Sequence, residues 1–448
     1  MSGETRHDVR AVARGRIGER LRQMGPTWVA GAVAAGPATM ASLLTAGASF
    51  GYALLWVVVL SAVLGALAQY LATRLGLLTE AGIVAVVEDR LGERWAWLLV
   101  ADVVLAAGLA QLVIMKTVAD VSAAVTGVDA RLWGVAWAAV LAVGLAGRGY
   151  RVLELGAKLL VSAVVVAFLA SLAVVPVDPA AAAGGLVPTV PGGVDGALVA
   201  AGVLGGAVHV TLVTMQSYTV RAREWTADDY GLATVDVGAS MLVAFGVYSL
   251  AIFLVAAGVL RGEIPAGDLT AVGAARALGP LAGPAAEWLF LLGLWGAAVS
   301  TLGGNTVVPP YLLADKLGWR TDVSDGRYRA LLAATALVGA GGVFVGGAFF
   351  PLLVLVLAFG LVGTPFALAV VLYLLNDPGA VPEPNSRLAN LGGLVLIGVT
   401  AVLAGRFVVE RAGGGLADPM TAFVVAFALV LGAATGGVAG KYLRGRPA

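Results

Sequence analysis

The chain lacks cysteine, has only two histidines and carries few charges. The absence of cysteine excludes disulfides, thiolate metal ligands and thiol redox chemistry. Charged residues make up 12% of the 448 positions, about half of the roughly 25% that is usual in soluble domains. No Walker motif occurs, and no nucleophile stands beside a base, so we expect neither a primary pump nor an enzyme, and no cofactor. A net charge of +1 without a basic stripe gives no reason to expect nucleic-acid binding.

Apolar residues dominate instead. Hydrophobic residues make up 60% of the chain and the mean hydropathy is +0.94, which indicates an integral membrane protein whose surroundings are the lipid bilayer. Runs of about 20 apolar residues are long enough to span a bilayer as helices. We therefore predict an all-α membrane protein with about 12 transmembrane helices, near residues 26–48, 51–72, 96–126, 132–147, 153–176, 197–220, 231–260, 284–313, 330–348, 351–376, 388–405 and 420–440.

The basic residues predict the orientation of these spans. Of the 28 Lys and Arg residues, 21 fall in connections that are cytosolic if the N-terminus is inside, five fall outside, and Lys116 and Lys158 lie within spans. This bias places both termini in the cytosol, in a bacterial-type plasma membrane. Residues 1–24 contain six arginines and no apolar run, so they are predicted to be a cytosolic tail rather than a signal peptide. Residues 25–440 are predicted to form a single transmembrane domain, and 441–448 a second cytosolic tail.

The first apolar segment is interrupted at Gly36-Pro37-Ala38-Thr39. Proline has no backbone N–H and clashes with the carbonyl one turn earlier, so a helix cannot continue through it undisturbed. Irregular backbone at membrane depth persists only where protein buries it or where it lines a cavity. Two half-helices that meet in the middle of a membrane are typical of a transporter's substrate site.

The sixth segment carries a second interruption. It has glycines at 202, 205 and 206, followed by His209, Thr211, Thr214 and Gln216 at helical spacing. Interruptions five spans apart predict two inverted repeats, about 25–176 and 197–376, with broken helices 1 and 6 and two extra helices over 388–440. His209 lies at mid-span, where an ionisable group is costly and functional by default. The alternative is a neutral histidine hydrogen-bonded between helices.

Several stretches resemble the Nramp family of proton-coupled divalent-metal transporters. The match runs from Gly25-Pro26 through residues 46–48 and 50–52 to Leu54-Leu55-Trp56 without a gap. Further similar stretches are 151–154, Thr234-Val235-Asp236, Pro365-Phe366-Ala367 and 385–390. The resemblance covers about 25–440 and implies a LeuT-type 5+5 inverted-repeat fold and a secondary, proton-coupled symporter.

The departures from that family pattern fall on its metal ligands. The family's first break is Asp-Pro-Gly-Asn; here Gly36 stands at the Asp and Thr39 at the Asn. The family's Met-Pro-His of the sixth span falls on His209, Val210 and Thr211. The family's third-span glutamate falls on Gln111. Its eighth-span glutamine falls near Val299, and its tenth-span glutamine falls on Gly363.

These departures leave the substrate open. Without a carboxylate at the break, helix N-termini and hydroxyls suit a small organic acid or an amino-acid-like solute. The alternative is the family default, a divalent cation such as Mg²⁺ or Mn²⁺, with Thr39 and His209 as the only evident side-chain ligands. A non-transporting sensor or scaffold is less favoured, because no appended cytosolic domain is evident. The predicted substrate-binding residues are Gly36, Ala38, Thr39, His209, Thr211, Thr214 and Gln216; each threonine has the alternative role of satisfying freed backbone groups.

Charged residues inside the spans suggest a proton pathway. Lys116 and Asp120 lie four residues apart and share a helix face. Together with His209 and Asp236 they form the predicted proton pathway. Protons are also the predicted coupling ion. The structural alternative is two self-neutralising pairs, Lys116–Asp120 and Glu154–Lys158, with Asp102, Lys158 and Asp236 near the membrane interface.

Overall fold

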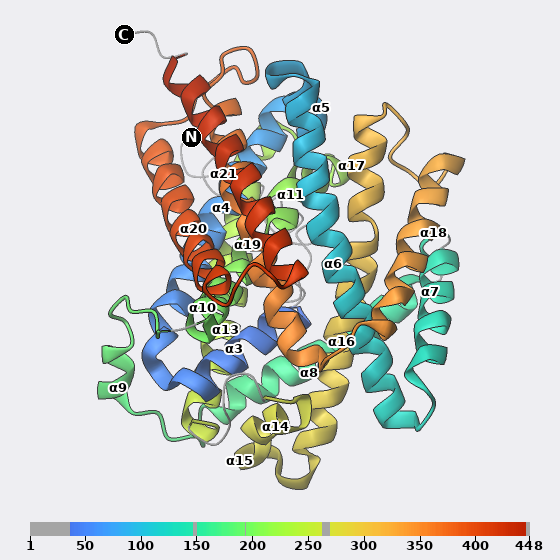
Figure 1. Ribbon diagram of the computed structural model, residues 1–448, viewed down its shortest axis with the longest axis vertical. Helices are drawn as coiled ribbons and strands as arrows, with labels where there is room; N and C mark the ends of the chain where they lie inside the picture. Colours follow the sequence, from blue (N-terminus) through green and yellow to red (C-terminus); the bar gives the residue numbers. More distant parts are fainter. Residues whose placement is uncertain (1–35, 147–149, 193, 262–268, 445–448) are drawn as a thin grey trace, which may run out of the picture.

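The computed structural model describes residues 36–146, 150–192, 194–261 and 269–444, and Figure 1 shows their arrangement. Within these ranges the regular structure is entirely helical and contains no strand. The predicted tail 1–24 and the residues of the first span that precede Gly36 lie outside the described residues. An all-helical bundle is what the apolar composition requires, because a helix satisfies its own backbone hydrogen bonds in lipid.

The first repeat contains five long helices. The 3₁₀ turn η1 (Gly51–Leu54) connects the first two of them, and the short helix α5 (Ile83–Leu91) lies between the second and the third. The long helices are α3 (Pro37–Phe50), α4 (Leu55–Thr79), α6 (Glu93–Thr126), α7 (Ala130–Ala146) and α8 (Tyr150–Ser171). The short α9 (Pro179–Gly184) lies in the connection that follows.

The second repeat begins with a helix pair that a single residue separates, and it ends in the central helix α19. Short helices α14 (Ala271–Ala275) and α15 (Gly279–Ala282) precede α16. The main elements are α10 (Val194–Val208), α11 (Val210–Ala222), α12 (Tyr230–Gly238), the π-helical η3 (Ala239–Phe245), α13 (Gly246–Val259), α16 (Ala286–Thr306), α17 (Val308–Lys316), α18 (Gly326–Ala340) and α19 (Phe349–Leu374).

Two further helices, α20 (Arg387–Gly413) and α21 (Pro419–Arg444), complete the bundle. Each of the twelve predicted segments overlaps at least one of these helices. Eight helical stretches in the described part of the chain are long and apolar enough to cross a membrane, and shorter apolar helices accompany them. The helix α21 continues to Arg444, past the predicted domain end at 440.

The helix α19 forms the centre of the bundle. It is apolar on all sides, and 89% of its most apolar window is buried, against 33% for α20 and 22% for α21. A helix that is apolar all round belongs in an interior. It packs against α3, α6, α10 and α11, while α20 and α21 lie together on its other side (Figure 1). Both interrupted segments therefore meet the same central helix.

Polar contacts tie helix ends together at the end of the bundle that is predicted to face the cytosol. Arg90 of α5 makes a two-pronged contact with Asp377, which follows α19, at 2.8 and 3.0 Å. Lys316 of α17 pairs with Glu88 at 3.0 Å. The Tyr218 hydroxyl of α11 donates to Asp315 of α17 at 2.6 Å.

Candidate functional site

The second interruption lies at His209 itself. The helix α10 ends at Val208 and α11 begins at Val210, with His209 between them at φ −53° and ψ 139°. The Val208 carbonyl accepts a hydrogen bond of 2.8 Å from the Thr364 hydroxyl of α19. The break is therefore stabilised by its neighbour, as irregular backbone in a membrane requires.

The glycines of the sixth segment do not interrupt the helix, so that part of the prediction is wrong. Gly205 and Gly206 lie inside α10, where they permit close packing. A Cβ on Gly206 would come within 2.8 Å of the Thr39 hydroxyl of α3, and one on Gly205 would overlap the Leu357 carbonyl of α19. The glycines thus bring the two broken segments and the central helix into contact.

The described part of the first interruption shows an abrupt helix start. The helix α3 begins at Pro37, which has Gly36 before it in extended backbone at φ −62° and ψ 176°. Proline suits this first position, because its missing N–H has no helical partner there. A Cβ on Gly36 would lie 2.9 Å from the Thr301 hydroxyl of α16. Thr301 therefore occupies the space that an acidic side chain at position 36 would need, while Ala38 and Thr39 are buried on α3.

His209 has one engaged and one unengaged ring nitrogen. Its Nδ1 lies 2.8 Å from the Thr211 hydroxyl and 3.3 Å from the Thr211 backbone nitrogen. Its Nε2 is buried and makes no hydrogen bond of standard geometry among the described residues, although the Val356 carbonyl of α19 lies close enough to the ring to interact with it. The ring lies against α19 where Gly360 leaves room, since a Cβ there would overlap it. A buried polar atom without a partner in a native fold points to a ligand or a functional role.

A second such group, Asp102 of α6, is one that sequence reasoning missed. It is 1% exposed, and neither carboxylate oxygen has a partner within the described residues. Its position near the membrane interface, the structural alternative given above, stays a prediction. The carboxylate lies against Gly363 of α19, where a Cβ would overlap it. The available signal was an ionisable residue within a span, which is a functional candidate by default.

The other predicted binding residues divide by what their side chains contact. Thr211 contacts His209, as described above. The Thr214 hydroxyl donates to the Val210 carbonyl of its own helix at 2.9 Å, which matches the structural alternative for a threonine. The Gln216 amide donates to the Thr73 hydroxyl of α4 at 2.8 Å. Only Thr211 of these three is in contact with the break, and substrate roles for Thr214 and Gln216 stay predictions.

The residues of the predicted proton pathway lie in separate contacts. Lys116 and Asp120 form an ion pair of 3.0 Å on α6. Asp236 of α12 is buried and pairs with Arg223 at 2.9 Å. Within the described part of the chain, neither ion pair forms a hydrogen bond or salt bridge with His209. Lys158 is half-buried on α8, and the Glu154 side chain lies outside the described ones.

Gln111, at the position of the family's third-span glutamate, is fully engaged in a buried network. Its amide nitrogen donates to the Thr306 hydroxyl at 2.7 Å, and its carbonyl accepts from the Asn305 amide at 2.8 Å. Asn305 also donates to the Ala107 carbonyl. The network joins α6 to α16, so Gln111 holds the scaffold around the site together.

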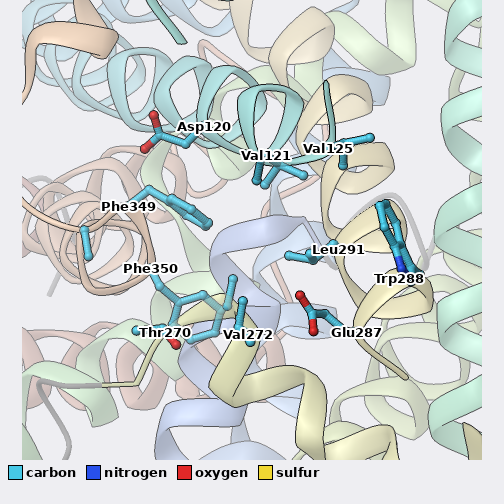
Figure 2. Close-up of a pocket in the computed structure, with 13 residues that line it drawn as sticks. Asp120, Val121, Val125, Thr270, Val272, Glu287, Trp288, Leu291, Phe349 and Phe350 are labelled. Atoms are coloured by element: carbon cyan, nitrogen blue, oxygen red, sulfur yellow. The ribbon is translucent and has the colours of Figure 1, made fainter. Parts of the chain in front are cut away.

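A cavity of about 340 Å³ lies at the end of the bundle that is predicted to face outward. Figure 2 shows Asp120 of α6 and Glu287 of α16 on opposite sides of it, with Phe349 and Phe350 of α19 along one wall. The lining is mainly apolar, and the two carboxylates are the only charged groups among the described residues that form it. The residues that line the cavity do not include His209 or Asp102.

The described residues contain no group of three or more His, Cys, Asp or Glu side chains placed to hold a metal ion. A bound cation would thus rely on hydroxyl and backbone oxygens as well. Two interrupted membrane segments, packed together at their breaks beside buried and unpartnered polar atoms, define a secondary transporter of the broken-helix class.

Comparison with known proteins assigns the family. The family described as "Natural resistance-associated macrophage protein-like" matches residues 27–410, and the chain belongs to this Nramp family of transporters. A "Divalent metal cation transporter MntH" of Mycobacterium tuberculosis is 28% identical over 400 residues, covering 85% of this chain and 89% of that protein. Another MntH, of Yersinia pestis, is 31% identical over 312 residues, covering 65% and 74%.

Solved structures agree on the fold. The Eremococcus coleocola manganese transporter, in complex with an aromatic bis-isothiourea substituted compound, superposes with a TM-score of 0.69 at 15% identity over 95% of this chain and 94% of that one. Mhp1, a nucleobase-cation-symport-1 family transporter, gives 0.52 at 16% identity over 93% and 92%. The predicted LeuT-type, all-helical fold is therefore confirmed.

Proposed function

We propose that this protein is a secondary transporter of a divalent cation of the Mn²⁺ or Mg²⁺ type. One observation carries the proposal: at the second helix break the His209 ring is held through Nδ1, while its buried Nε2 faces α19 without a hydrogen bond of standard geometry among the described residues. Imidazole nitrogen is a common ligand of transition metals. The names of the curated MntH relatives support the same substrate class.

The Thr211 hydroxyl sets which nitrogen can bind a cation. In the tautomer in which Nδ1–H donates to the Thr211 hydroxyl at 2.8 Å, Nε2 carries the lone pair and can coordinate a metal. The Thr211 backbone N–H, which donates to Nδ1 at 3.3 Å, and the Val356 carbonyl favour the other tautomer, so a bound cation has to select the first. Metal-binding histidines usually donate their other N–H in this way, which fixes the tautomer and the ring orientation. Thr39, together with backbone carbonyls near the breaks, supplies the oxygen ligands that Mn²⁺ and Mg²⁺ prefer.

A small organic acid or amino-acid-like solute is the second candidate. In the other tautomer Nδ1 accepts from the Thr211 backbone N–H at 3.3 Å, and Nε2–H becomes a hydrogen-bond donor. The N-termini of α3 and α11 both begin at the breaks and favour anionic groups. This candidate uses Gly36, Ala38, Thr39 and Thr211 as its binding surface.

The coupling ion and orientation complete the proposal. We take protons as the coupling ion, with Lys116, Asp120, His209 and Asp236 as the pathway, and both termini in the cytosol of a bacterial-type cell. Lys116→Ala together with Asp120→Asn then reduces uptake driven by a pH gradient. Unchanged pH-driven uptake in this double variant would show that the pair is structural.

Uptake into proteoliposomes tests the substrate. We expect saturable Mn²⁺ or Mg²⁺ uptake that falls at least about tenfold in His209→Ala, since outer-sphere partners alone typically contribute 10–100-fold. His7→Ala, which alters the only other histidine, is the matched control. If wild-type protein moves no divalent ion while a small carboxylate raises its unfolding temperature, the organic solute replaces the cation as substrate.

A further inference from the structure

We propose that Asp102 supplies the negatively charged ligand of the cation site, and that Gly363 is the position that admits it. This inference rests on the cation transport proposed above and adds a specific binding residue to it. Asp102 lies on α6, which is neither of the two broken segments. The site therefore includes a third helix in addition to the two that meet at the breaks.

The central helix places Asp102 beside His209. The His209 ring overlaps the Cβ position of Gly360, and the Asp102 carboxylate overlaps that of Gly363. Cβ positions three residues apart on a helix are about 5–6 Å apart, so the two side chains reach the same face of α19 within about 10 Å of each other. Both present polar atoms to this face that make no hydrogen bond of standard geometry among the described residues. One partly hydrated divalent cation can span that separation.

Charge explains why this arrangement favours a cation. A carboxylate that is buried without a partner is costly when ionised, so it either holds a proton or pairs with a cation. Among the described residues nothing pairs with Asp102. Lys116 on the same helix is 14 residues away and is already paired with Asp120 at 3.0 Å. The cation is the counter-charge that the fold itself does not provide.

The substitutions at two family ligand positions fit this assignment. Position 36 has lost the acidic side chain of the family pattern, and the Thr301 hydroxyl lies where that side chain would extend. Position 363 has lost a glutamine, and the resulting space holds the Asp102 carboxylate. The negative charge has moved from the first broken helix to α6, and Gly363 makes the move sterically possible.

The donor set indicates the class of cation. One imidazole nitrogen, one carboxylate and hydroxyl or carbonyl oxygens suit Mn²⁺ and similar borderline-hard divalent ions, and no thioether is present to favour soft ones. With two titratable ligands the ion keeps part of its water shell, as such ions commonly do in sparse oxygen sites.

Binding of Mn²⁺ to the purified full-length protein tests the inference. Calorimetry and the Mn²⁺ electron paramagnetic resonance signal report binding without requiring transport. We expect Asp102→Asn to weaken Mn²⁺ binding by about 100-fold or more, since even outer-sphere partners contribute 10–100-fold. The same variant should raise the unfolding temperature of the metal-free protein, because it removes an unpaired buried charge. A purely structural role would lower it.

Matched variants separate the possible outcomes. Gly363→Ala keeps Asp102 but displaces it, so Mn²⁺ binding should also fall at least tenfold. Gly108→Ala, on α6 with no atom within 4 Å of the new Cβ, is the matched control and should retain wild-type binding. Wild-type affinity in both Asp102→Asn and Gly363→Ala overturns this inference and leaves the proposed function standing. Absence of any divalent binding by the wild type overturns both.

Discussion

The Thr364 hydroxyl of α19 donates a 2.8 Å hydrogen bond to the Val208 carbonyl, the last carbonyl before the second helix break. The same hydroxyl lies 3.1 Å from the Gly360 carbonyl of its own helix. One side chain thus joins the break to the central helix one turn from the position where His209 packs. The break and α19 should therefore behave as one structural unit.

Removing this hydroxyl should destabilise the protein. Thr364→Val leaves the buried Val208 carbonyl without a partner, and an unsatisfied buried group costs about 1–3 kcal/mol. We expect a lower unfolding temperature in detergent, and Thr364→Ser should restore most of it. Equal unfolding temperatures for the valine variant and the wild type would show that another group satisfies the carbonyl.

The glycines of α10 should be sensitive to a single added methyl group. In Gly205→Ala the Cβ meets the Leu357 backbone carbonyl, which cannot move aside without shifting α19. Overpacking of this kind typically costs about 1–3 kcal/mol. Gly398→Ala on the peripheral α20 has no atom within 4 Å of its Cβ, and should stabilise slightly because alanine favours helices. The unfolding temperatures of the two variants test this packing. A higher unfolding temperature for Gly205→Ala than for Gly398→Ala would contradict it.

The identity of residue 209 should determine metal preference. A thioether is a softer ligand than imidazole and selects softer ions. We expect His209→Met to raise the ratio of Cd²⁺ to Mn²⁺ uptake in proteoliposomes several-fold relative to the wild type. His209→Gln, which offers a hard oxygen, is the control and should not favour Cd²⁺. A Cd²⁺ preference already present in the wild type and unchanged in both variants would show that residue 209 does not contact the ion.

The Arg90–Asp377 contact should make stability depend on pH in the acidic range. Its hydrogen bonds to Arg90 lower the pKa of the Asp377 carboxyl below its usual range, which is about 3.9 in an unfolded chain. The contact therefore stabilises fully above about pH 4, and the contribution is lost as the pH falls through the lowered pKa. The unfolding temperatures of wild type and Asp377→Asn should differ at pH 7 by the equivalent of about 1 kcal/mol or less. The two unfolding temperatures should converge as the pH falls toward 3, where the Asp377 carboxylate takes up a proton. A difference that stays constant with pH would show that the charge of Asp377 is not its cause.

Particular residues show how far sequence reasoning reaches. Pro37 marks the start of α3 because a proline's effect on a helix is local and independent of the rest of the fold. The break in the sixth segment was located only to within a few residues, because glycines inside α10 looked like an interruption and act instead in packing. Whether a glycine bends a helix or admits a neighbour depends on what that neighbour is.

The partners of polar side chains were out of reach for a similar reason. Gln216 contacts Thr73, and Asp102 lies beside Gly363, which is more than 250 positions away in the chain. Helical spacing indicates which residues share a face, but it does not say which helix that face meets.

The sequence by itself determined the membrane-spanning segments, the two interrupted helices and the family, because hydropathy, proline and motif order act locally or along the chain. Only the tertiary structure decided that His209 and Asp102 approach the same glycine-lined face of α19. That outcome depends on helix packing between distant segments, where a missing side chain on one helix creates the space for a polar group from another.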